Sequence, residues 1–220
     1  MEKSYPVLKP IYDTGLILEN LKSVLESNWT GDGGFTEIFE NEWSQYTGYK
    51  NSIYTNSCTA ALHLALLIIK DKFPQRKKVI VPDITFISTA SVVLQSSLEL
   101  VLCDIDETLC MNSDSLKELI DKDTLGVIYV GIGGNTSNLR KINNLCKLNE
   151  VPLIIDAAHM AGGKLDSKTK PHLGEFAEFV CYSFQAVKNL GIADSGMICF
   201  QNNNYIEQVS KYRWLGIDKT

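Results

Sequence analysis

The chain has 220 residues, of which 45% are hydrophobic and 21% charged, and its formal net charge is -5 with a pI of about 5.3. This length is enough for one large domain with a substantial core, and the composition is ordinary for a soluble globular chain. The acidic balance without a basic run argues against nucleic acid and against anionic membrane surfaces as binding partners.

Targeting and redox signals are weak. The opening MEKSYPVLKP lacks the apolar segment of a signal peptide, and apolar runs such as ALHLALLII are far shorter than the roughly 20 residues that a membrane span needs. The six cysteines are scattered without a CxxC pair, so we expect reduced, buried thiols in a cytoplasmic protein. The three isolated histidines do not provide a metal-ligand spacing, and no metal site is expected.

The N-terminal part of the chain predicts two helices, over residues 16–27 and 36–46, separated by the glycine-rich loop NWTGDGG. From residue 52 onward the pattern becomes regular, because short β-branched runs alternate with helical segments. The predicted strands are NSIYT, KVIVP, LELVLCDID, LGVIYV, PLIID, AEFVCYSF and SGMICF. The predicted helices between them are CTAALHLALLIIKDK, TFISTASVVLQSS, SLKELIDK and SNLRKINNLCKLNE.

This alternation is typical of repeated βαβ units, so we expect an α/β fold of three layers, with a mainly parallel central sheet covered by helices. The segment 58–72 is apolar nearly all round, which predicts a buried helix. No internal repeat and no low-complexity linker divides the chain, and residues 1–220 are interpreted as one large domain. Ligands of such sheets usually bind beyond the carboxyl ends of the strands, so the residues that follow each strand are the candidates for a site.

Two strand ends offer polar or aromatic groups with competing interpretations. After the strand IYT, a polar turn with Cys58 and Thr59 opens the buried helix, where free N–H groups and the helix dipole suit a phosphate. A simple helix cap by Ser57 or Thr59 explains the same residues. After KVIVP, Phe86 is placed near the same rim and could stack on a flat ligand, although an aromatic residue there is more often part of the core.

The other two strand ends carry ionisable residues. Asp156 ends an apolar strand, where a carboxylate is costly to bury without a partner, and His159 follows it at the spacing of either a helix cap or part of a site. Lys188 follows the strand AEFVCYSF. Held in a partly dry pocket, its amine would be a nucleophile able to form a Schiff base with an aldehyde, whereas a lone lysine is most often a solvated surface residue.

Taken together, the four strand ends form one consistent set: a phosphate cradle, a stacking aromatic ring, an acidic partner for a ring nitrogen and a nucleophilic lysine. These are the parts that pyridoxal 5′-phosphate needs, because the lysine binds the cofactor aldehyde and the aspartate keeps the pyridine nitrogen protonated, so that the ring can accept electrons.

The chain resembles the DegT/StrS-like sugar aminotransferases, the nucleotide-sugar branch of the fold-type-I enzymes that use pyridoxal 5′-phosphate. The resemblance covers about residues 10 to 217, and the DAAH and SFxxxKNL segments carry most of its specificity. The matching segments are NWTGDGGFTEIFENEW, TNSCTAALHLAL, VIVPDITFISTAS, VPLIIDAAHMAGG and YSFQAVKNLG, in the order that the family has.

The resemblance implies a role for each matching position. Lys188 corresponds to the lysine that binds the cofactor and moves the substrate proton, and Asp156 to the partner of the pyridine nitrogen. His159, where many relatives have Gln, corresponds to a residue near the ring hydroxyl, and Phe86 to the residue that stacks on the ring. The remaining matches are the Cys58–Thr59 backbone and the Ser183 hydroxyl as phosphate ligands, and Trp29 and Thr30 as neighbours of the sugar substrate.

The resemblance also implies the reaction, which is transamination of a keto-sugar nucleotide with L-glutamate as amino donor. Relatives that act as dehydratases have His at the position of Lys188, so the lysine favours transamination. Relatives are homodimers with active sites at the subunit interface, and we expect at least a dimer here. They also continue into a smaller C-terminal domain that is absent from this sequence, for which a shortened chain, an interrupted gene and a second polypeptide are alternative explanations.

Several features depart from the family pattern or leave rival functions open. Relatives often carry Gly at the position of Cys58, and their two glycines after an acidic residue appear here as Asp194, Ser195 and Gly196. A catalytically incomplete subunit that needs a partner chain is one rival function. Another fold-type-I activity on an amino acid, such as that of a desulfurase or a lyase, is a second.

Overall fold

The computed structural model describes residues 11–164, 173, 175 and 177–217 of the chain. The opening decapeptide considered above for targeting lies outside the described residues. No helix in the described ranges is long and apolar enough to cross a membrane.

The described residues form one sheet of seven strands in the order β1-β7-β6-β5-β4-β2-β3. The strands from β3 to β6 pair in parallel, whereas β7 pairs antiparallel with both β6 and β1. The sheet is therefore mainly parallel, as the alternating pattern predicts. The strands are β1 (Asn51–Thr55), β2 (Lys78–Pro82), β3 (Glu99–Cys103), β4 (Thr124–Val130), β5 (Leu153–Asp156), β6 (Phe179–Ser183) and β7 (Gly196–Phe200).

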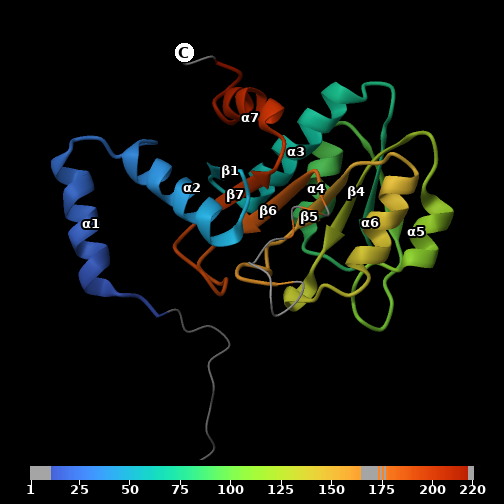
Figure 1. Cartoon of the computed structure of the whole chain (residues 1–220), viewed down its shortest axis with the longest axis horizontal. Coiled ribbons are helices and arrows are strands. Elements are labelled where there is room, and N and C mark those ends of the chain that lie inside the picture. The colour runs from blue at the N-terminus through green and yellow to red at the C-terminus, as the bar shows by residue number, and fades with distance from the viewer. Residues whose placement is uncertain (1–10, 165–172, 174, 176, 218–220) are drawn as a thin grey trace, which may run out of the picture.

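Helices cover both faces of this sheet, which gives the expected three layers (Figure 1). Side chains of α2, α5 and α6 contribute to the core on one face, and those of α3, α4 and α7 to the core on the other. The helices are α1 (Thr14–Glu26), α2 (Gly34–Thr47), α3 (Cys58–Lys72), α4 (Ile87–Gln95), α5 (Ser113–Leu119), α6 (Leu139–Leu148) and α7 (Ile206–Arg213), with short 3-10 turns at η1 (Ile132–Gly134) and η2 (Asn203–Tyr205).

The helix α3 has the bounds that the sequence predicts, and it is buried along most of its length. Its apolar side chains, including the fully buried Leu62 and Leu66, pack under the sheet against β6 and β7. Burial of an apolar helix fixes its first turn at the carboxyl end of β1, and this turn carries Cys58 and Thr59.

Several predicted bounds differ from the structure by a few residues, and one helix was not predicted. The first helix begins at Thr14 rather than Leu16, because the Asp13 carboxylate accepts a hydrogen bond from the Leu16 N–H at 3.0 Å and caps it. The segment predicted as a helix from Thr85 begins at Ile87, with Phe86 as its extended N-cap residue. The helix α7 was not predicted, since its sequence IEQVSKYR buries only Val209 and carries little apolar pattern.

Candidate active site

A cavity of about 410 Å³ lies at the carboxyl ends of the parallel strands. Its walls come from the segments that follow β1, β2, β4, β5 and β6, and from the residues just before β7. Because β7 is antiparallel to β6, its first residues lie at the same edge of the sheet as the ends of the parallel strands. Seven residues singled out in the sequence line this one cavity: Cys58, Thr59, Phe86, Asp156, His159, Ser183 and Lys188.

The first turn of α3 forms one end of the cavity. The Ser57 hydroxyl accepts from the Ala60 N–H at 3.1 Å, so the helix-cap interpretation is correct for Ser57. That cap leaves the backbone N–H groups of Cys58 and Thr59 without an acceptor among the described residues. A cap and an anion site therefore coexist in this turn, and free N–H groups at a helix N-terminus favour a bound anion.

Gly196 allows β7 to approach this turn closely. A Cβ added at Gly196 would lie 2.4 Å from the carbonyl carbon of Ser57 and 2.5 Å from the nitrogen of Cys58. Real Cβ atoms do not occupy such positions. Of the two glycines in the family's acidic–Gly–Gly pattern, this chain keeps Gly196. Close packing of β7 against the first turn of α3 requires a glycine at this position.

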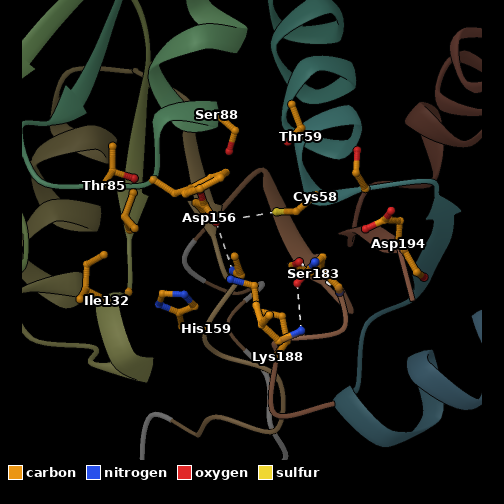
Figure 2. A pocket seen from close by; sticks show the side chains of 18 residues that line it. Cys58, Thr59, Thr85, Ser88, Ile132, Asp156, His159, Ser183, Lys188 and Asp194 are labelled. Carbon is orange, nitrogen blue, oxygen red and sulfur yellow. Dashed lines mark hydrogen bonds between the residues drawn. The ribbon is translucent and has the colours of Figure 1, made fainter. Parts of the chain in front are cut away.

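Asp156 lies at the end of β5 with only 3% of its surface exposed. Its Oδ2 accepts a hydrogen bond from the Thr89 hydroxyl at 2.8 Å, and its Oδ1 accepts from the Ala158 N–H at 3.1 Å. The Cys58 thiol lies 3.7 Å from the same Oδ1, as Figure 2 shows. Burial raises the pKa of Asp156, and these hydrogen bonds oppose the shift. No ion pair among the described residues includes this carboxylate.

The buried Cys58 side chain lies beside Asp156. Burial, followed by the charge of Asp156, raises the pKa of Cys58 well above its usual value, so its thiol remains a proton donor. Sγ also lies 3.4 Å from the carbonyl oxygen of Cys181. All six cysteines of the chain are buried and free, in agreement with the expectation from their spacing.

His159 and Lys188 lie on the opposite side of the cavity from α3, and Figure 2 shows both side chains near Asp156. The Nδ1 atom of His159 accepts from the Gly133 N–H at 3.2 Å, which makes Nε2 the protonated nitrogen of the neutral ring. Partial burial and then the positive charge of Lys188 lower the pKa of His159, whereas Asp156 opposes the shift. Lys188 is a half-buried residue, and its positive charge acts on both His159 and Cys58.

Phe86 and Ser183 complete the set. Phe86 is 70% exposed at the rim of the cavity, so the interpretation of it as a core aromatic is wrong. The Ser183 side chain is buried at the end of β6, and its hydroxyl accepts from the Gln185 N–H at 3.4 Å. Its remaining hydrogen-bonding capacity faces the cavity.

Trp29 and Thr30 are not brought to this cavity. Both are exposed in the loop between α1 and α2, where the Trp29 indole N–H donates to the carbonyl oxygen of Asp32 at 2.8 Å. Asp32 in turn forms an ion pair with Arg213 at 3.0 Å. The loop is therefore held against the end of α7, and a substrate role for Trp29 and Thr30 stays a prediction.

Two threonines at the site were missed by sequence reasoning. Thr85 lines the cavity, and Thr89 is fully buried behind it, with their hydroxyl oxygens 2.8 Å apart. Their spacing was a signal, because a helix predicted from Thr85 would place residues four apart on one face. In the structure Thr85 precedes α4, and the two hydroxyl groups still meet, with that of Thr89 reaching Asp156 at the end of β5. The described residues contain no group of three or more His, Cys, Asp or Glu side chains that could hold a metal ion.

Comparison with known proteins shows the family of the chain. Residues 12–220 match the model of the DegT/DnrJ/EryC1/StrS aminotransferase family. An uncharacterised protein of Methanocaldococcus jannaschii, MJ1066, is 32% identical over 198 residues, which are 89% of this chain and 50% of that protein. The chain thus spans about half the length of the curated relative that it matches.

Solved structures show the same fold. The aminotransferase PseC of Helicobacter pylori, involved in the biosynthesis of pseudoaminic acid, superposes with a TM-score of 0.86 at 25% identity, covering 99% of this chain and 58% of PseC. Spr1654 of Streptococcus pneumoniae, solved in a PLP-form, superposes with a TM-score of 0.82 at 25% identity, covering 96% of this chain and 56% of Spr1654. The α/β architecture is therefore that of sugar aminotransferases.

Proposed function

The chain belongs to the DegT/DnrJ/EryC1/StrS aminotransferase family, and we propose that it carries the cofactor site for pyridoxal-5′-phosphate-dependent transamination of a keto-sugar nucleotide. L-Glutamate is the amino donor in this proposal. The observation that carries it is the convergence of Asp156, Lys188 and the first turn of α3 on one cavity. The role of PseC in pseudoaminic acid biosynthesis supports a sugar substrate, and the PLP-form of Spr1654 supports the cofactor.

The residues of the cavity fit this cofactor. A volume of about 410 Å³ falls within the usual size of small-molecule sites. Asp156 is a buried carboxylate without a cationic partner among the described residues, and a protonated pyridine nitrogen would supply that partner. The unpaired N–H groups of Cys58 and Thr59 would accept a phosphate, with the hydroxyl groups of Thr59 and Ser183 beside them.

Lys188 is the nucleophile of the proposed site. Its backbone N–H donates to the carbonyl oxygen of Gln185 at 2.8 Å, which closes a turn directly after β6 and keeps the side chain at the cavity. The neighbouring Asn189 amide donates to the carbonyl oxygen of Ala161 at 2.8 Å and ties this turn to the segment after β5. The turn is thus fixed on both sides of the lysine, which keeps the amine near the ring position that Asp156 defines.

The other cavity residues orient and shield the ring. Phe86 lies at the open rim, where its ring would cover one face of the cofactor and exclude water from it. The neutral His159 would donate from Nε2 to the ring hydroxyl, because its Nδ1 is already occupied by Gly133. Ala158 is small and leaves room for a flat ring over the end of β5.

When bound, pyridoxal 5′-phosphate supplies an aldehyde for the amino group and a ring that accepts the electrons of the broken bond. Asp156 holds the proton on the ring nitrogen, which strengthens that electron acceptance. The free amine of Lys188 removes the proton from Cα of the amino donor. In the second half of the reaction, the same amine returns a proton to the sugar carbon that receives the nitrogen.

The partners follow from the same proposal. We propose a homodimer, and a nucleotide sugar approaching from the side of the loop that carries Trp29 and Thr30. A second polypeptide that completes the small domain is compatible with the proposal, and so is a longer chain of the relatives' length.

The first test is spectroscopic. Purified protein with added pyridoxal 5′-phosphate should develop an absorption band near the visible edge. Borohydride should convert that band to a stable adduct on the peptide that contains Lys188. Lys188→Ala should show neither the band nor the adduct, whereas Lys50→Ala, on the exposed approach to β1, should keep both. An unchanged band in Lys188→Ala would overturn the assignment.

A second test separates the reaction from other fold-type-I activities. The protein is incubated with L-glutamate and a keto-sugar nucleotide, and 2-oxoglutarate is measured against sulfide release from cysteine. Formation of 2-oxoglutarate that depends on the sugar supports transamination. Sulfide release without it would identify a desulfurase instead.

A further inference from the structure

A chain of two hydroxyl groups, half-buried at Thr85 and fully buried at Thr89, leads from the wall of the cavity to Asp156. The Thr85 and Thr89 oxygens are 2.8 Å apart, and the Thr89 oxygen is 2.8 Å from Oδ2 of Asp156. Thr89 is fully buried in the first turns of α4, whereas Thr85 lies in the cavity wall (Figure 2). The helix itself does not need the Thr89 hydroxyl, because the backbone N–H of Thr89 already donates to the carbonyl oxygen of Phe86.

The direction of these hydrogen bonds follows from the charge of the carboxylate. An ionised Asp156 can only accept, so the hydroxyl of Thr89 must donate to it. The Thr89 oxygen is then the acceptor for Thr85, and the hydroxyl proton of Thr85 points away from the cavity. Protonation of Asp156 would remove this constraint, because a carboxylic acid can donate as well as accept.

Thr89 matters because its hydroxyl makes the largest of the contributions that offset the burial of Asp156, ahead of the Ala158 N–H and the Cys58 thiol. The titratable groups around the carboxylate are the thiols of Cys58 on α3 and Cys181 on β6, and His159 in its own loop. Lys188, which follows β6, lines the same cavity, and its charge acts on Cys58 and His159. The thiols are weak donors, and the proton of Cys58 is shared with the carbonyl oxygen of Cys181. His159 is neutral in its present hydrogen bonding. The Thr89 hydroxyl therefore donates the short side-chain hydrogen bond that Oδ2 of Asp156 accepts.

We propose that Thr89, oriented by Thr85, is a positioning residue that keeps Asp156 ionised and turned toward the pyridine nitrogen of the cofactor. This inference rests on the function proposed above. Thr89 does not line the cavity, so it would act on the cofactor only through its hydrogen bond to Asp156. The same chain makes the Thr85 oxygen an acceptor toward the cavity for as long as Asp156 is charged.

The test measures the affinity for pyridoxal 5′-phosphate itself, by absorbance titration from about pH 5 to about pH 9. Thr89→Val removes the hydroxyl at nearly constant shape. It should weaken binding about tenfold at neutral pH and move the acid limb of the binding curve to higher pH, because hydrogen bonds to charged groups are the strong ones. Thr89→Ser should restore the wild-type curve. Thr85→Val should shift it in the same direction by a smaller factor.

The background variant Asp156→Asn separates positioning from packing. If Thr89 acts through the charge of Asp156, Thr89→Val should not alter the pH dependence in that background. A binding curve of Thr89→Val that coincides with the wild type, or an equal shift in the Asp156→Asn background, would overturn the inference. Thr89→Ala, which also lacks the hydroxyl but adds no bulk, serves if Thr89→Val does not fold. Failure of the wild-type protein to bind the cofactor would instead refute the proposed function and, with it, this inference.

Discussion

Arg213 at the end of α7 donates to the half-buried carboxylate of Glu40 on α2 across a distance of 3.0 Å. The same guanidinium lies 3.0 Å from Asp32 and 3.4 Å from the carbonyl oxygen of Tyr54. Glu40 accepts in turn from the Tyr54 N–H at 2.7 Å. One arginine thus joins the last described helix, the N-terminal helix pair and the edge strand β1.

We expect Arg213→Met to lower the free energy of unfolding by about 1–3 kcal/mol, because the variant leaves the half-buried Glu40 without its cation. Burial raises the pKa of Glu40, and the Tyr54 N–H and Arg213 oppose that shift. Without Arg213 the folded state holds the Glu40 proton more tightly. The loss of stability should therefore be smaller at acid pH than at neutral pH in urea denaturation.

Glu207→Gln is the control for Arg213→Met. It removes the partner of Lys211 on the same helix, where the glutamate side chain is 78% exposed. Exposed pairs of this kind contribute little, so the control should change the free energy of unfolding by less than about 0.5 kcal/mol. Equal effects of the two variants on the free energy of unfolding would show that the contacts of Arg213 with Asp32 and Glu40 do not stabilise the fold.

The sequence predicts most of the fold because its strands are short apolar runs that alternate with helices. The apolar side chains of each strand must be buried, and the helices on the two faces of the sheet bury them. The bounds of α3 follow from its fifteen-residue apolar segment, CTAALHLALLIIKDK. The helix α7 escaped prediction because it is held by polar links such as that of Arg213, which have no periodic signature. The pairing of β1 with β7 likewise cannot be predicted from local sequence patterns, because it joins the first strand of the chain to the last.

For the site, the residues after each strand could be predicted because the carboxyl ends of parallel strands meet at one edge. Asp156 and Lys188 stand out in such positions. Thr89 could not be found in that way, because it lies inside a helix and reaches the site only through a second side chain. The placement of Trp29 depends on the Asp32–Arg213 pair, which links two ends of the chain.

Gly196→Ala should loosen the phosphate end of the cavity. The added Cβ would meet the backbone of Ser57 and Cys58 at 2.4–2.5 Å, and backbone cannot rotate away as a side chain can. We expect a loss of about 1–3 kcal/mol in stability together with weaker binding of pyridoxal 5′-phosphate. Gly126→Ala in β4 is the matched control, because its new Cβ would meet only the Pro152 carbonyl oxygen at 3.5 Å. Binding that stays at the wild-type level in Gly196→Ala would contradict a role of this turn in holding the phosphate.

His159→Gln should change how the protein responds to acid. The folded-state pKa of His159 is lowered, so the folded protein binds fewer protons at this residue than the unfolded chain does. Protonation therefore costs stability as the pH falls below the ordinary histidine value of about 6.5, and it breaks the hydrogen bond from Gly133 to Nδ1. Glutamine cannot titrate. The variant should lose less stability than the wild type between neutral and mildly acid pH in thermal denaturation, and parallel curves would refute a lowered pKa.

Asp156→Asn should separate stability from function at the same position. The pKa of Asp156 is raised by burial, so the folded protein holds this proton more tightly than the unfolded chain, and stability falls as the pH rises through the window above the ordinary aspartate value of about 3.9. Asparagine carries no charge. Its one side-chain oxygen can still accept from the Ala158 N–H, and its NH2 group can donate to the Thr89 hydroxyl oxygen in place of the bond that Oδ2 accepts in the wild type. Without cofactor, the stability of the variant relative to the wild type should therefore increase from acid to neutral pH, as measured by urea denaturation at several pH values. With pyridoxal 5′-phosphate the order should reverse, because only the aspartate can pair with a protonated ring nitrogen. A variant that gains as much stability from the cofactor as the wild type would show that Asp156 is a buried structural acid and not the partner of the ring.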